Sequence, residues 1–447
     1  RTPSLGACRA MPSPSVLRWA LASAACGSVC GDMVVPAGQF ALSWSDNISV
    51  QTQPGYAQIL PEVPGRLIVT SFQGAPIVGK NAVYMYTFDD CAQDCLQMLP
   101  GSDAINWPNA VTGLNASVFG FEALVVGGGF LVPTHATGGV VVLEAGRDVF
   151  RRLRLETASP SPKHLPKPVK LTRDRHGWFY HVAVPYDMDG DGRMDFVTAR
   201  CQYGILPWGM KRGELVWLQQ PSSSPLSGEP WVEHHLTGGP DFLFCQQPGA
   251  DTFAIAAPEY ISKRIMYYYM DGGMMRNRTI DDASGPGFSC SWADLNGDGR
   301  LELLATNHLN KDGSVLAYSF DSDDFASAAV QRHVLATGFS AISDKRGTAS
   351  PGDAIAFKPS DAYTGKPYVF VSGDNDNSIY LLVPTSQHSG DWSYTVQKVA
   401  YLGADVGRPA IADTDRDGFM DVYVPAYDSR VIVHYEFGAA PASEVLV

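Results

Sequence analysis

The sequence is poor in charged residues, and most of the charge it carries is negative. Charged residues make up 18% of the 447 positions, and 33 Lys and Arg against 46 Asp and Glu give a net charge of −13. Such an acidic chain is unsuited to phosphate backbones and anionic lipids, so nucleic acid is not an expected partner. With 45% hydrophobic residues, it is neither a disordered chain nor a coiled coil.

The sequence also lacks a transmembrane segment and the short motifs of common enzymes. No apolar run approaches the roughly 20 residues that cross a bilayer. Gly-x-Ser-x-Gly, Gly-x-Gly-x-x-Gly, a phosphate loop, His-Glu-x-x-His and Cys-x-x-Cys are all missing. We therefore predict no catalytic residue from the sequence.

The N-terminal residues 1–31 have the features of upstream residues followed by a signal peptide. A weakly basic stretch begins at Met11, and a run of small apolar residues follows from Trp19 to Val29. A disordered apolar tail is the alternative. Export would agree with three N-glycosylation acceptors, at Asn47, Asn115 and Asn277. We expect a secreted or extracellular protein.

Cysteine spacing allows two bridges in an oxidising compartment. Cys91 and Cys95 are close enough to bridge a turn. Cys245 and Cys290 fall at similar places in successive repeats, where a bridge between neighbours and a pair of buried free thiols are equally compatible with the sequence.

What the chain does contain is a repeat. The sequence is rich in Gly (44), Pro (31) and aromatic residues, a composition typical of many short strands joined by turns. Three Asp-rich segments, Asp187–Asp195, Asp294–Glu302 and Asp413–Asp421, each lie between two strand-like runs. The intervals between them are twice the length of one four-stranded unit. A degenerate unit fills each gap, and two more precede the first segment.

Seven strand–turn–strand units between residues 36 and 438, with no helical periodicity, predict an all-β fold, a seven-bladed β-propeller. A linear β-solenoid has shorter repeats. The ring would close if Phe40–Trp44 completed the blade that carries Val431–Phe437. Residues 439–447 would form a short C-terminal tail.

The Asp-rich segments predict calcium loops. In the first, acidic residues at positions 1, 3, 5 and 9 surround one point, the carbonyl of Arg193 joins them, and Gly192 permits the sharp turn. Hard oxygen ligands in that number favour Ca²⁺. An EF-hand is excluded because position 12 holds Thr198, Ala305 or Val424 instead of Glu, and strands flank the loops.

The loops resemble those of the FG-GAP or VCBS repeat family, the calcium-loop propellers of integrin α-subunits, a mushroom lectin and some secreted carbohydrate-active enzymes. The resemblance implies about three structural Ca²⁺ ions, with Arg193, Arg300 and Phe419 serving through backbone oxygens. Arg416 stands where the other loops have Gly190 and Gly297, so we expect weaker binding there. The implied ligands are Asp187, Asp189, Asp191, Arg193 and Asp195; Asp294, Asn296, Asp298, Arg300 and Glu302; and Asp413, Asp415, Asp417, Phe419 and Asp421.

A ligand surface is expected on the opposite face, where the turn after each blade's second strand emerges. Tyr203 and Trp208 could stack on a sugar ring, and Arg200 could engage an acidic or hydroxyl group. Polar turns that simply face water are the alternative. The candidate ligand-binding residues are Arg200, Tyr203, Trp208, Glu259, His308 and Asp374.

These features favour a secreted binding module, lectin-like or adhesive, whose partner is a glycan or an extracellular protein. The alternative is a carbohydrate-active enzyme of the lyase or dehydratase type, since the resembling family includes such propellers. A cell-surface structural scaffold is the third possibility.

Overall fold

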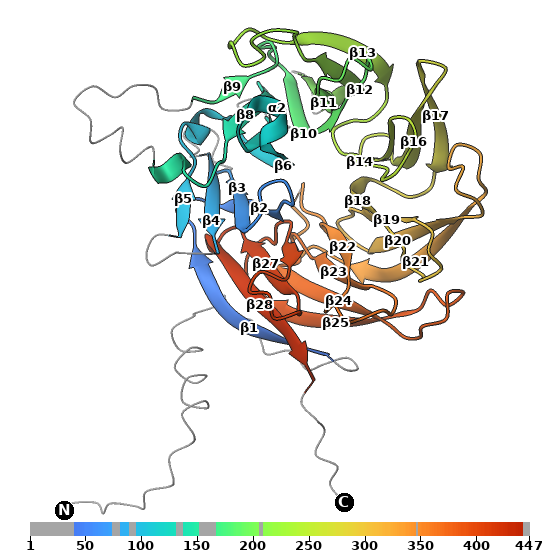
Figure 1. The fold of residues 1–447 in the computed structure, drawn as a ribbon. Coiled ribbons are helices and arrows are strands. Elements are labelled where there is room, and N and C mark those ends of the chain that lie inside the picture. Colours follow the sequence, from blue (N-terminus) through green and yellow to red (C-terminus); the bar gives the residue numbers. More distant parts are fainter. Residues whose placement is uncertain are drawn as a thin grey trace, which may run out of the picture.

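The computed structural model describes residues 40–73, 81–88, 95–130, 137–151, 167–204, 209–345 and 347–440. In this part of the chain, seven antiparallel four-stranded sheets form a ring (Figure 1), so the predicted seven-bladed β-propeller is confirmed. Three short helical elements, η2 (Ser102–Ala104), α2 (Ala116–Phe119) and the helical residues 149–151, lie in and beside the second blade in the described part of the chain. No helix in the described ranges is long and apolar enough to cross a membrane.

We number the blades 1 to 7 in chain order, and four consecutive strands make up each of blades 1 to 6. Blades 1 to 3 contain β2 (Pro54–Ile59), β3 (Arg66–Ser71), β4 (Ala82–Thr87) and β5 (Leu96–Met98); β6 (Pro108–Leu114), β7 (Ala123–Gly128), β8 (Gly139–Glu144) and β9 (Val169–Lys170); and β10 (Trp178–Tyr186), β11 (Asp195–Gly204), β12 (Gly209–Gln219) and β13 (Val232–Gly238).

Blades 4 to 6 follow the same order. They contain β14 (Cys245–Gln246), β15 (Ala254–Glu259), β16 (Arg264–Asp271) and β17 (Met274–Asp281); β18 (Gly287–Ala293), β19 (Glu302–Asn307), β20 (Gly313–Phe320) and β21 (Val330–Phe339); and β22 (Ala354–Phe357), β23 (Tyr368–Ser372), β24 (Ser378–Pro384) and β25 (Tyr394–Tyr401).

Blade 7 joins the two ends of the propeller. Its strands β26 (Ala410–Ala412), β27 (Asp421–Ala426) and β28 (Val431–Ala439) come from the end of the chain, and β1 (Phe40–Ser49) supplies the outer strand. Phe40 pairs with Ala439, Leu42 with Phe437 and Trp44 with Tyr435. The predicted closure of the ring is therefore confirmed.

Burial changes from the second strand of a blade to the fourth. Every residue of β3, β7, β15, β19 and β27 is buried, because both faces of a second strand pack against neighbouring blades. The outer strand β21 instead exposes Val334 to 52%. Strands that are buried on both faces appear in the sequence as continuous apolar runs, so the second strands could be predicted from the sequence.

Cys245 and Cys290 form a disulfide between the first strands of blades 4 and 5, β14 and β18, with their Cα atoms 5.8 Å apart. Of the two alternatives left open by the sequence, the bridge is therefore the one the fold adopts. Cys201 is a buried free thiol. Cys91 lies outside the described residues, so the Cys91–Cys95 bridge stays a prediction.

Candidate functional site

The three Asp-rich loops connect the first and second strands of blades 3, 5 and 7, that is, β10 to β11, β18 to β19 and β26 to β27. All three connections therefore emerge on the same face of the ring, in alternate blades. The turns between second and third strands emerge on the other face.

The loops share one pattern of backbone hydrogen bonds. In the first loop, Asp187 accepts from the N–H groups of Gly190 and Gly192, both at 2.9 Å, and Asp195 accepts from the N–H of Met188 at 3.1 Å. The equivalent bonds occur in the second loop and in the third. The same fold of the loop therefore positions the first and last acids in each case.

The carboxylates that these bonds position suit a hard divalent cation. Asp187, Asp189 and Asp195 each place one oxygen within 4.8 Å of the others, and so do the matching residues of the third loop, Asp413, Asp415 and Asp421. The donor set is oxygen only, which fits Ca²⁺. Asp191 is ion-paired with the Arg193 side chain and does not belong to that group.

The second loop has one charge fewer because Asn296 replaces an acid. Its Nδ2 donates to Asp298 at 3.1 Å. Burial, with smaller contributions from the neighbouring Asp298 and Asp294, raises the pKa of Glu302 to about 7. A bound cation would offset the repulsion between these acids.

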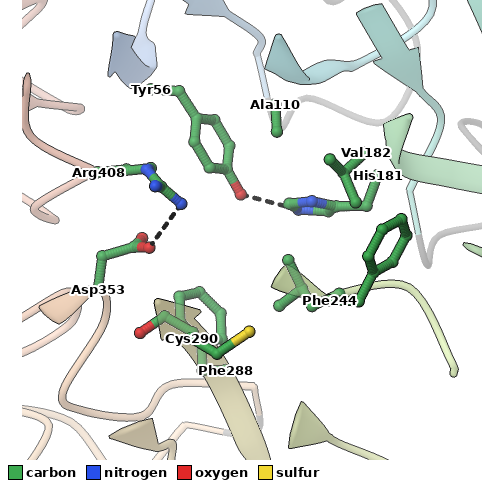
Figure 2. A pocket seen from close by; sticks show the side chains of 11 residues that line it. Tyr56, Ala110, His181, Val182, Phe244, Phe288, Cys290, Asp353 and Arg408 are labelled. Atoms are coloured by element: carbon green, nitrogen blue, oxygen red, sulfur yellow. Dashed lines mark hydrogen bonds and ion pairs between the residues drawn. The ribbon is translucent and has the colours of Figure 1, made fainter. Parts of the chain in front are cut away.

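A second candidate site lies at the axis of the propeller. The pocket there is lined by the first strand of each blade, or by residues just before that strand, so all seven blades contribute. Four polar side chains converge in it: Tyr56 from blade 1, His181 from blade 3, Asp353 from blade 6 and Arg408 from blade 7 (Figure 2). Its enclosed volume of about 40 Å³ has room for one functional group.

Hydrogen bonds pair these side chains across blade boundaries. The Tyr56 hydroxyl lies 2.8 Å from His181 Nε2, and Arg408 Nη1 donates to Asp353 Oδ1 at 3.3 Å. Blades 1 and 7 are also joined at the axis by the backbone, since the Arg408 N–H donates to the Gly55 carbonyl at 2.9 Å. An added Cβ at Gly407 would lie 2.1 Å from that carbonyl oxygen, so glycine is required for the approach.

Burial favours the uncharged forms of three pocket groups, and among them it raises the pKa of Asp353, an effect that Arg408 opposes. Desolvation, with a smaller contribution from Arg408, lowers the pKa of His181 to about 3, so the imidazole is neutral at physiological pH. His181 Nδ1 is buried and has no hydrogen-bond partner among the described residues. Burial, and then the charge of Asp353, raises the pKa of Tyr56, which is therefore a phenol able to donate a proton.

A series of aromatic rings surrounds the pocket at the end where the second strands finish. Phe72 contacts Tyr56 at a ring distance of 6.4 Å and stacks on Trp107 at 4.4 Å. On the other side Phe242 contacts both His181 and Tyr260. Phe72, Phe130, Tyr260, Phe288 and Tyr427 are partly exposed.

Two of the six predicted ligand-binding residues lie in this region. His308 stacks on the pocket residue Phe288 at 4.1 Å, and its Nε2 lies 3.4 Å from Asp374 Oδ2. Burial lowers the pKa of His308 to about 4. Burial raises the pKa of Asp374 well above its usual value, with Asp405 and Asp353 adding to the effect.

The other predicted residues have different surroundings. Arg200 is 5% exposed and bonds to Glu214 and Glu233 within its own blade. Glu259 is fully buried, where Arg264 and Tyr268 donate to it. Residues 201–204 and 209–213 belong to β11 and β12, where they pair with each other. The side chain of Tyr203 and the whole of Trp208 lie outside the described part.

The sequence did not point to Tyr56, His181, Asp353 or Arg408. These residues are separated by at least 55 positions, and only the ring geometry brings them together. Of the glycosylation acceptors, Asn115 and Asn277 are exposed, whereas Asn47 is half-buried within β1.

No family model matches the chain, and no curated protein matches its sequence. Among solved structures it is similar to a luciferin-regenerating enzyme (9% identity, covering 90% of this chain and 97% of that one, TM-score 0.41). It is also similar to a puromycin-hydrolysing peptidase of Mycobacterium tuberculosis (13% identity, covering 90% of this chain and 56% of that one, TM-score 0.46). A third similar structure is an oligogalacturonate lyase of Vibrio parahaemolyticus (11% identity, covering 92% of this chain and 99% of that one, TM-score 0.41). Similarities at these identities and TM-scores do not bear on function, and the FG-GAP or VCBS resemblance stays a prediction that rests on the three loops.

Proposed function

We propose that this protein is a secreted, calcium-binding β-propeller that recognises a carbohydrate at its axial pocket, as a lectin-like module. The observation that carries the proposal is the convergence of Tyr56, His181, Asp353 and Arg408 from four blades within a surround of aromatic rings. Ligand sites combine apolar walls with a few convergent polar groups in this way.

The chemistry of the pocket suits a sugar better than a strongly charged ligand. Asp353 accepts and Arg408 donates, which is what vicinal hydroxyl groups require of a binding site. The pocket itself admits one functional group, while partly exposed rings such as Phe72 and Tyr427 offer faces for a pyranose.

Calcium has a structural part in this proposal. The three loops lie on the face opposite the second-strand turns, so cations bound there would stabilise blades 3, 5 and 7 without contacting the ligand. The resemblance to FG-GAP or VCBS propellers, the predicted N-terminal leader and the exposed acceptors Asn115 and Asn277 support calcium binding and secretion.

A glycan array, followed by calorimetric titration of the best ligand, tests the proposal. Arg408→Ala should weaken binding at least tenfold, since it removes a donor from the pocket. The matched control is Arg276→Ala, which removes a half-exposed arginine paired with Asp271 on an outer strand. Saturable binding that Arg408→Ala leaves unchanged would contradict the assignment of the pocket, and a silent array would favour the scaffold alternative.

An enzyme acting on carbohydrate at the same pocket is the second candidate, and the Tyr56–His181 pair favours it. A phenol and an imidazole stand 2.8 Å apart in the pocket, and both are side-chain types that serve in general acid–base catalysis. Incubation of the array ligand with protein, followed by chromatography of the products, separates the two functions. Turnover that Tyr56→Phe abolishes would establish the enzyme, and unchanged ligand would favour the module.

A further inference from the structure

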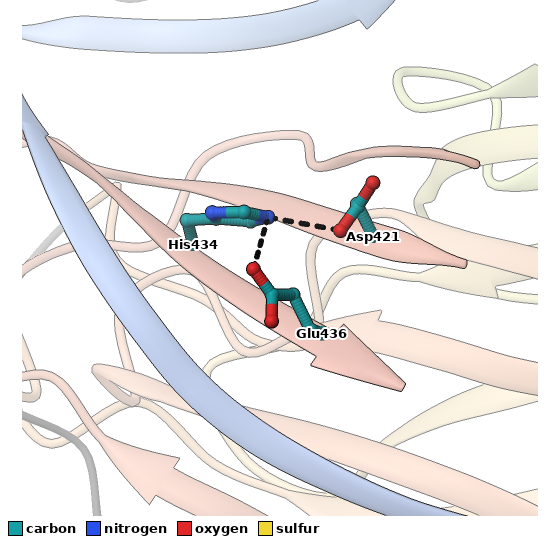
Figure 3. Close-up of side chains that lie close together, drawn as sticks. All are labelled: Asp421, His434 and Glu436. Atoms are coloured by element: carbon teal, nitrogen blue, oxygen red, sulfur yellow. Dashed lines mark hydrogen bonds and ion pairs between the residues drawn. The ribbon is translucent and has the colours of Figure 1, made fainter. Parts of the chain in front are cut away.

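A histidine and two acids meet on one face of the closing blade, and only Asp421 among them belongs to a motif that the sequence indicated. Asp421 on β27 pairs directly with Glu436 on β28. His434 is two residues before Glu436, so both side chains point to the same face of the sheet. Figure 3 shows His434 Nε2 directed at both carboxylates.

The three side chains already have the separations that a shared ion needs. His434 Nε2 lies 3.1 Å from Asp421 Oδ1 and 4.0 Å from Glu436 Oε1. One ligand atom from each residue lies within 4.8 Å of the others. Ligand atoms about 2 Å from one ion stand at such separations from each other.

The remaining contacts hold the imidazole in place. His434 Nδ1 lies 3.0 Å from Asp46 Oδ1 on the closing strand β1, and the ring stacks on Tyr423 at 4.3 Å with the planes 7° apart. When Nδ1 carries a proton and donates it to Asp46, the Nε2 lone pair faces Asp421 and Glu436. Metal-binding histidines are commonly oriented by a carboxylate in this manner.

We propose that Asp421, His434 and Glu436 bind a transition-metal dication of the Zn²⁺ type, at a site separate in chemistry from the calcium loops. The imidazole nitrogen is the discriminating ligand, because Ca²⁺ takes oxygen ligands whereas Zn²⁺ takes nitrogen and oxygen together. Water would complete the tetrahedron, since Glu436 is 49% exposed.

The site lies where the two ends of the propeller are joined. Its ligands come from β27 and β28, and Asp46 belongs to β1, so a bound ion would reinforce the three outermost strands of blade 7. Asp421 also belongs to the third Asp-rich loop, where its Oδ2 accepts from the Thr414 N–H at 2.8 Å. Its Oδ1 is the oxygen that faces His434, so the hydrogen bond within the loop and the contact with the imidazole use different atoms.

Calorimetric titration of Zn²⁺ into chelator-stripped protein, in the presence of saturating Ca²⁺, tests the proposal. We expect about one equivalent to bind and the melting temperature to rise with Zn²⁺. His434→Gln should lose at least 100-fold in Zn²⁺ affinity, and Asp46→Asn should lose about 10-fold to 100-fold by releasing the imidazole.

The matched control is His388→Gln, which changes an exposed turn histidine and should bind Zn²⁺ like the wild type. Glu436→Gln provides a second variant at a half-exposed position in case His434→Gln fails to fold. The alternative is a protonated His434 that bridges Asp46 and Asp421 as an ion pair. Absence of Zn²⁺ binding, or equal binding by wild type, His434→Gln and Glu436→Gln, would establish that alternative and overturn the proposal.

Discussion

Arg416 adopts a backbone conformation that its counterparts reach with glycine. Its φ is +66°, and Gly190 and Gly297 at the same loop position have φ of +73° and +78°. A residue with a Cβ in this left-handed region costs about 1 kcal/mol relative to glycine. We therefore expect Arg416→Gly to raise the free energy of unfolding by about 1 kcal/mol, measured by urea denaturation at saturating Ca²⁺.

The reverse change in the second loop is the control. Gly297→Ala should lower stability by about the same amount, since the backbone there is equally left-handed. If Arg416→Gly proves neutral or destabilising, then the Arg416 side chain stabilises its loop by more than the strain costs.

The buried His181 should make stability depend on pH. Its pKa is lowered to about 3 in the folded protein, against a model value of 6.5, so the unfolded chain binds the extra proton first as the pH falls. The contribution of the neutral His181 side chain to the free energy of unfolding is fully present above about pH 6.5 and is lost towards pH 3. Between pH 7 and pH 4.5 the loss amounts to about 2 kcal/mol.

Comparison of wild type with His181→Gln isolates this effect. The unfolding free energy of the variant should fall by about 2 kcal/mol less over that pH range, whereas the exposed control His388→Gln should follow the wild type. Parallel pH profiles for all three proteins would show that His181 titrates as an ordinary histidine.

Which site residues the sequence can reveal depends on how far apart they lie along the chain. The ligands of each Asp-rich loop fall within nine positions, so their spacing alone predicts the cluster. Tyr56 and Arg408 are brought together by strands of the first and last blades, and no local pattern marks either residue. The His434–Tyr435–Glu436 segment carries a weak signal, the alternation that puts two ligands on one strand face.

At the scale of strands, burial decides what can be predicted. The second and third strands were identified because they are continuous apolar runs between neighbouring blades. The first strand of blade 4, β14, has only two residues, and the composition of so short a segment does not distinguish a strand from a loop. Outer strands such as β17 have no buried residue, so their sequences resemble polar turns.

The disulfide between β14 and β18 should contribute to the cohesion of blades 4 and 5. It closes a loop of 45 residues, and cross-links of this size add about 4 kcal/mol by restricting the unfolded chain. The Cys245→Ser and Cys290→Ser variants should each lose about that amount, measured by chemical denaturation.

The double variant tests whether the bond itself is responsible. It should lose no more than either single variant, because the bond is already absent in each. Additive losses would show instead that the separate packing of the two side chains accounts for the effect. Cys201→Ser would not serve as control, since that thiol is fully buried.

The whole molecule is a closed ring. Its closure could be predicted from the sequence because the two strands that join the ends, β1 and β28, both carry apolar residues at alternate positions. Leu42 on β1 and Phe437 on β28 are both buried and directly paired. The axial pocket is a property of this ring alone. Each blade supplies a few unremarkable residues near the start of its first strand, and only seven blades together define their arrangement.

The electrostatics of the ring should make its stability depend on calcium. The three loops concentrate four, three and four acidic side chains of a chain whose net charge is −13. Without cations these carboxylates repel one another, and Asp298 and Asp294 add to the effect of burial in raising the pKa of Glu302. A cation that binds the folded protein at about 1,000 times its Kd adds about 4 kcal/mol for each site.

Chelation should therefore lower the melting temperature markedly, and adding Ca²⁺ back should restore it. The measurement is a thermal scan in EGTA, then with excess Ca²⁺ or with Mg²⁺ as the control ion, in the His434→Gln variant so that the site at Glu436 does not contribute. Mg²⁺ should restore less, because it demands tighter octahedral geometry and gives up water reluctantly. An unchanged melting temperature would mean that the loops hold their shape through the backbone bonds to Asp187 and its counterparts alone.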